Sequence, residues 1–138
     1  MRIRQNLRIR QGHKMKKINV LTKAFLILWL VGSLIAFIAH LFIPITVSNL
    51  SFWNASIGWQ REIALWNLSI IIIIIYSLIK DNSISGKLVV FLTIISLLLG
   101  TNHLLTLLIN KKIILSNLLN TITNYCMVIL GIYITLIK

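Results

Sequence analysis

Glu62 is one of only two acidic residues in the chain, and it stands at the start of a long apolar stretch, directly after Arg61 and five residues before Asn67. A carboxylate at membrane depth is costly, so it normally pairs with another polar group and is often functional. Glu62 could cap its helix, form an ion pair with Arg61, or act as a proton-linked or ligand-binding carboxylate. The sequence leaves these alternatives open.

Two histidines also fall inside apolar stretches, His40 and His103, the second directly after Asn102. Both are predicted to lie roughly 10 Å below the same membrane boundary, at 1.5 Å per helical residue. Three interpretations remain open: hydrogen bonds between helices, a proton relay or contact with a quinone head group, and haem ligation by both histidines. No resident cofactor and no other metal site are predicted.

The last apolar stretch carries Asn117, Asn120 and Asn124 in the half near that same boundary. Such amides either bond helices together or line a polar path. The polar residues within the membrane therefore crowd one half of the protein. No enzymatic site is expected, since Glu62 and Asp81 cannot form a paired-carboxylate site and no phosphate loop, zinc spacing or nucleophile elbow occurs.

The elements that position these residues are predicted from composition. Of 138 residues, 58% are hydrophobic and 12% charged, which is typical of a membrane protein rather than a soluble domain. A spanning helix needs about 20 apolar residues, and four stretches qualify: about 24–47, 63–79, 88–109 and 113–137. We expect an all-α, integral membrane four-helix up-down bundle over residues 24–138, behind a basic tail at 1–23.

The tail holds eight of the fourteen basic residues. By the positive-inside rule both termini are then cytoplasmic, and the tail contacts anionic lipids. The expected location is a bacterial plasma membrane, with a membrane-protein partner or homo-oligomer possible and no nucleic acid, because no aromatic platform accompanies the charges. Met15 is an alternative start to Met1.

The connections follow from the same pattern. Residues 44–59, with Phe52, Trp53 and Trp59, should lie on the outer membrane surface. Residues 80–87 and 110–112 are predicted as tight turns. Helical spacing groups Glu62, Trp66, Ser69 and Tyr76 on one stripe of the second span.

Two segments resemble a known family: Arg61-Glu62 followed by Asn67-Leu68-Ser69, and Gly100-Thr101-Asn102-His103. They are similar to those of an uncharacterised family of small bacterial four-helix membrane proteins, DoxX-like in shape. The resemblance covers about residues 57–105 and departs from the family at Ala64 and Ile71, where glycines are expected. The resemblance implies the four-span topology but no activity. The candidate site residues that it singles out are Arg61, Glu62, Asn67, Asn102 and His103.

The expected function is therefore that of a non-enzymatic accessory or lipophilic-ligand-binding module with a polar cluster in the outer half of the bundle. The alternative is a proton-coupled transporter or a redox subunit that uses Glu62 and His103.

Overall fold

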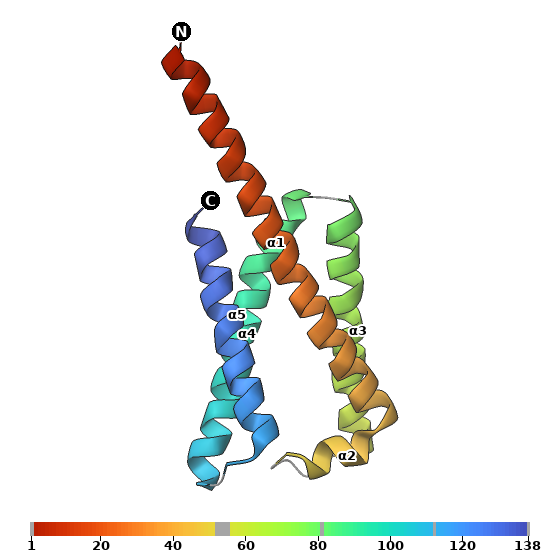
Figure 1. Cartoon of the computed structure of the whole chain (residues 1–138). Coiled ribbons are helices and arrows are strands. Elements are labelled where there is room, and N and C mark those ends of the chain that lie inside the picture. The colour runs from red at the N-terminus through yellow and green to blue at the C-terminus, as the bar shows by residue number, and fades with distance from the viewer. Residues whose placement is uncertain (1, 52–55, 81, 112, 138) are drawn as a thin grey trace.

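The computed structural model describes residues 2–51, 56–80, 82–111 and 113–137, and all regular structure in them is helical. The helices are α1 (Arg2–Phe42), α2 (Pro44–Asn49), α3 (Ile57–Lys80), α4 (Asn82–Asn110) and α5 (Leu115–Leu136) (Figure 1). Four segments are long and apolar enough to cross a membrane: Val20–Phe42, Ile57–Lys80, Ile84–Asn110 and Leu115–Leu136. The predicted all-α class and its four candidate spans are confirmed.

The first helix ends earlier than its apolar stretch. Proline has no backbone N–H to continue a helix and disfavours the helical conformation in the residue before it. Ile43 accordingly leaves the helical region, with φ −129° and ψ 48°, and Pro44 starts the separate helix α2. The predicted span 24–47 is thus divided between α1 and α2, and α1 itself extends back through the basic segment to Arg2.

Helix α3 begins at Ile57, earlier than the predicted residue 63. Ser56 caps it, because its hydroxyl oxygen accepts the backbone N–H of Trp59 at 3.2 Å. Of the alternatives left open for Glu62, helix capping is excluded, since the first turn of α3 contains no acidic residue. Trp59 belongs to that first turn and is exposed, whereas Phe52 and Trp53 lie outside the described residues.

The connections between the later helices are short. The turn predicted over residues 80–87 is wrong in extent, because α4 already begins at Asn82. The hydroxyls of Ser77 and Ser85 lie 2.8 Å apart and join α3 to α4 beside this connection. At the other end, α4 stops at Asn110 and Lys111 adopts a left-handed φ of 48°, as a tight reversal requires.

The long helices pack as two pairs, α1 with α3 and α4 with α5. We call the end where α3 meets α4 the tail end, because α1 projects beyond the other helices there and α5 also ends there (Figure 1). The opposite end carries α2, and we call it the α2 end. The two pairs converge toward the tail end and diverge toward the α2 end (Figure 1).

The apolar core lies where the pairs converge. It draws on all four spanning helices, and its buried members are Phe25, Leu26, Ile70, Ile74, Leu88, Val89, Leu92 and Ile134. Each belongs to the tail-end half of its membrane-spanning segment. Burial of these side chains against one another is what joins the two pairs.

Close backbone approach holds α4 against α5. Gly131 faces Thr93 so closely that a Cβ atom on the glycine would lie 1.9 Å from the threonine hydroxyl oxygen. Toward the α2 end, a Cβ atom on Gly100 would lie 3.1 Å from the Cβ atom of Asn124. The hydroxyls of Thr101 and Tyr125 lie 3.2 Å apart. Small residues of this kind let membrane helices approach closely, which here fixes the register of the pair.

Candidate binding site between the helix pairs

In the α2-end half, the buried side chains change from mostly apolar to mostly polar. Four helical polar residues there are almost wholly inaccessible: Gln60, Thr106, Asn117 and Thr121. Gln60 is 4% exposed and Asn117 1%. Polar groups are costly to bury in an apolar environment unless they are hydrogen-bonded, so this half of the interior is built for polar contact.

A polar contact joins α1 to α3 in this half. The Nδ1 atom of His40 bonds to the Oε1 atom of Gln60. A carbonyl oxygen can only accept, so Nδ1 carries the proton and donates it. Leu26, Ser33 and His40 follow one another at intervals of seven residues, or about two helical turns, and so lie on one stripe of α1. Ser33 is 2% exposed and Leu26 0%, so this stripe faces inward.

The helix registers bring polar residues of four helices to about one level. Along two antiparallel helices the residue numbers increase in opposite directions with the same rise per residue. The numbers of two residues at the same level therefore always add up to the same sum. The His40–Gln60 bond sets this sum for α1 and α3, and the Ser77–Ser85 contact sets it for α3 and α4. Together they place Asn102 and His103 of α4 level with His40 and Gln60. The Thr101–Tyr125 contact adds the α5 segment 121–124. We call this level the polar layer.

A second group of polar residues lies about two helical turns closer to the core, or about 10 Å. The same registers place Ser33 of α1, Asn67 of α3 and Ser96 of α4 there. Ser33 and Ser96 are 2% and 0% exposed, and within the described chain their hydroxyl oxygens have no hydrogen-bond partner. The same is true of the Nδ2 atom of Asn117. These groups leave hydrogen-bonding capacity inside the protein.

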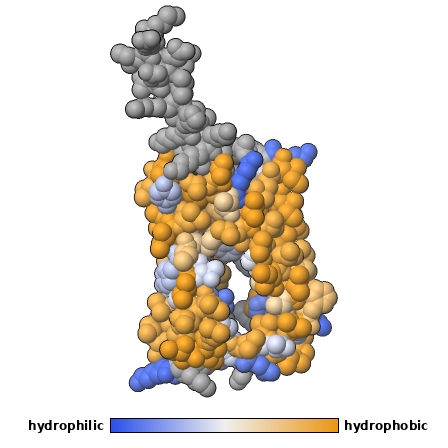
Figure 2. All heavy atoms as spheres, viewed as in Figure 1, coloured by the Kyte–Doolittle hydropathy of each residue, from blue (hydrophilic) through white to orange (hydrophobic). Residues whose placement is uncertain are grey.

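An opening separates the two helix pairs in this half. Figure 2 shows it in the lower part of the molecule, bordered by hydrophilic side chains, whereas the surface around it is largely hydrophobic. Below the opening the pairs are joined again, because the hydroxyl of Ser116 on α5 donates to the backbone carbonyl of Leu50, next to α2. The opening is therefore bounded by the apolar core on one side and by this contact on the other.

Five of the residues predicted as site candidates lie at least partly inside the protein: His40, Asn67, His103, Asn117 and Asn124. Two of their amides are bound within their own helices. Asn67 donates to the carbonyl of Ile63 at 2.9 Å, and Asn124 donates to the carbonyl of Asn120 at 2.8 Å. Each of these two therefore keeps only its amide oxygen and its second N–H for another contact.

The other four candidates are exposed: Arg61, Glu62, Asn102 and Asn120. Glu62 therefore does not take part in the polar cluster that the sequence predicts inside the bundle. Its predicted stripe through Trp66, Ser69 and Tyr76 is exposed throughout, whereas Gln60, Ala64, Ile71 and Ile74 are buried. Two residues of helix rotate a side chain by about 200°, so Glu62 points away from the face that holds Gln60.

Glu62→Gln should consequently change the free energy of unfolding by less than about 0.5 kcal/mol, as surface substitutions do. Unfolding of the purified protein by SDS in mixed micelles measures this. A loss above about 1.5 kcal/mol would show that the carboxylate has a buried partner, contrary to its exposed position.

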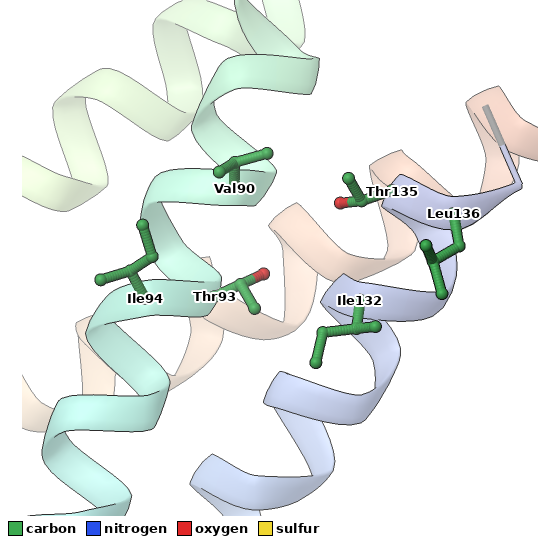
Figure 3. A pocket seen from close by; sticks show the side chains of 6 residues that line it. All are labelled: Val90, Thr93, Ile94, Ile132, Thr135 and Leu136. Carbon is green, nitrogen blue, oxygen red and sulfur yellow. The ribbon is translucent and has the colours of Figure 1, made fainter.

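The structure also has a groove of about 190 Å³ between α4 and α5 near the tail end. Thr93 and Thr135 project toward one another across it (Figure 3). Their hydroxyls donate to the carbonyls of Val89 and Gly131 at 2.7 and 2.8 Å, so the groove presents mainly methyl groups. It lacks the hydrogen-bonding capacity of the opening.

Sequence reasoning missed Gln60, the most informative residue of the site. The predicted second span, about 63–79, begins after it, and only the extension of that short span back over Ile57 to Trp59 includes it. A signal was available in Ser56, a preferred helix-capping residue four positions earlier. Among the described residues, no three His, Cys, Asp or Glu side chains group as metal ligands would.

Comparisons with known proteins identify a family but no activity. No curated protein and no solved structure matches the chain. One family model matches residues 3–138, almost the whole chain. The chain therefore belongs to a family of unknown function, DUF6790.

Proposed function

We propose that this protein is a non-enzymatic membrane protein that holds one small lipophilic molecule in the opening between its helix pairs. The observation that carries the proposal is the division of the interior. An apolar core fills the tail-end half, whereas the α2-end half buries polar side chains beside an opening. Ligand sites combine apolar walls with a few polar groups that fix orientation, and this half offers both.

The ligand is lipophilic because of where the opening lies. It is flanked by the candidate spans, whose outward side chains are largely apolar. A molecule would therefore enter from the bilayer.

The proposal includes a topology. The up-down arrangement has both termini in the cytoplasm, because the segment 1–23 carries eight basic residues and cytoplasmic loops are enriched in lysine and arginine. The site then faces the outer half of a bacterial plasma membrane. The basic segment would contact anionic lipids, at about 1 kcal/mol per basic residue. A distant likeness in shape to DoxX-like proteins belongs to the same proposal.

The position of Glu62 favours binding over the relay alternative. A proton relay through Glu62 and His103 needs the two side chains to exchange protons directly or through water. Glu62 is exposed on α3, whereas His103 lies on the stripe of α4 that includes the buried Ser96. A binding role needs no carboxylate.

Native mass spectrometry of the purified protein with 4-octylphenol tests the proposal. We expect one bound molecule that saturates at a 1:1 ratio. The matched control is Glu62→Gln, which alters only the exposed face and should bind equally. Adducts that grow in number with concentration and never saturate would contradict a single site.

A further inference from the structure

We infer that the site selects lipophiles whose polar end donates a hydrogen bond, such as a phenol, a quinol or a long-chain alcohol, and that the Nε2 atom of His40 accepts it. This inference rests on the proposed function and specifies its ligand class. It starts from the contact between His40 and Gln60.

The contact fixes the tautomer of His40. Because Gln60 accepts through Oε1, the imidazole proton resides on Nδ1. A neutral imidazole has one donor and one acceptor nitrogen, so Nε2 keeps a free lone pair. Gln60 is 4% exposed, and its burial holds the amide against the ring.

The ring lies where a ligand could reach it. His40 is half-buried, more accessible than the buried Gln60 behind it, and it continues the inward stripe of α1. It belongs to the polar layer beside the opening.

The rest of the interior argues against charged ligands. The buried polar residues of the described spans are Thr22, Ser33, Gln60, Ser77, Ser85, Ser96, Thr106, Asn117 and Thr121. None carries a charge. An anionic head group would lack a cationic partner and a cationic one would lack a carboxylate, and burying an unpaired charge is strongly unfavourable. A neutral hydroxyl needs only the acceptor that His40 supplies.

Two ligands that differ in a single donor test this inference. The protein in lipid nanodiscs is titrated with 4-octylphenol and with 4-octylanisole, whose methyl ether keeps the ring and chain but removes the O–H. Affinities are expressed relative to partitioning into empty nanodiscs. We expect the phenol to bind about tenfold more tightly, equivalent to about 1.4 kcal/mol.

Two variants locate the effect. His40→Phe keeps a ring of similar size without the acceptor, and should bring the two affinities to within about twofold, a difference of less than 0.5 kcal/mol. Gln60→Leu removes the group that fixes the tautomer, and should reduce the preference without abolishing it. Thermal melting of each variant checks that it is folded. If His40→Phe does not fold, the inference is still tested by comparing the preference for the phenol over the anisole between the wild type and Gln60→Leu.

The outcomes separate the two proposals. Equal, saturable binding of both ligands to the wild type would overturn the inference while leaving the proposed function intact. Saturable binding of neither would overturn the proposed function. A phenol preference that persists in His40→Phe would assign the acceptor to another residue and overturn the role of His40.

Discussion

Gly131→Ala is expected to lower the free energy of unfolding by about 2–3 kcal/mol, as overpacking of a tight interface does. The new methyl group would lie 1.9 Å from the hydroxyl oxygen of Thr93 and 3.0 Å from its Cβ atom. Thr93 cannot turn away without cost, because its hydroxyl donates to the carbonyl of Val89 at 2.7 Å. Helices α4 and α5 would have to separate. SDS unfolding in mixed micelles measures the loss.

Gly32→Ala is the matched control. A Cβ atom there would meet no heavy atom within 4 Å, so alanine should be neutral or stabilising by up to about 1 kcal/mol, the difference in helix propensity. Thr93→Ala should partly rescue Gly131→Ala, because it removes the closest atom. If the two glycine variants unfold alike, the close approach of α4 and α5 at Gly131 is incorrect.

His40→Leu is expected to cost about 1–2 kcal/mol, because it leaves the buried amide of Gln60 without its partner. Gln60→Leu removes both the amide and the requirement for a partner, so the double variant should recover part of the loss. Unfolding of the wild type, both single variants and the double variant gives a double-mutant cycle. Its coupling energy between His40 and Gln60 should be about 1 kcal/mol, in the upper part of the range for hydrogen bonds between membrane helices.

The control for this cycle pairs His40 with Glu62, which lies on the opposite side of α3 from Gln60. His40→Leu and Glu62→Gln should be additive within about 0.5 kcal/mol, as independent sites are. Coupling that is stronger with Glu62 than with Gln60 would contradict the orientation of α3 and restore the carboxylate to the interior.

The four spans could be predicted because long apolar stretches leave few alternatives in a chain of this composition. The crowding of polar residues toward one end was also visible, since His40, His103 and the asparagines of α5 are all near that end of their stretches. Both features depend on distance along the chain, which the sequence gives directly.

The rotation of each helix could not be predicted in the same way. In a soluble protein the apolar stripe marks the buried face, but in a membrane the outward face is apolar as well. Helical spacing therefore selected the stripe of α3 through Glu62 and Tyr76 as the inward one. The one through Gln60 and Ile74 is buried by packing against α1, which only the three-dimensional arrangement specifies.

The division of the interior assigns different tasks to its two halves. Residues such as Phe25, Ile74 and Leu92 hold the helix pairs together at the tail end. In the α2-end half, the described contacts that bridge the pairs include the Ser116–Leu50 hydrogen bond, and the proposed ligand would lie between this contact and the core. Under the proposed function, substitutions in the tail-end half should therefore affect stability, and substitutions in the α2-end half should affect binding.

Photolabelling tests the central claim most directly, because it reports where a lipophile resides. The wild-type protein in nanodiscs is irradiated with a long-chain alcohol that carries a diazirine, and the labelled residues are mapped by peptide mass spectrometry. We predict labels concentrated in the α2-end half, on segments 33–40, 60–67, 96–103 and 117–124, that disappear with excess 4-octylphenol. Labels spread evenly over outward residues such as Ile72 and Ile129, and unaffected by the competitor, would contradict a binding site between the helix pairs.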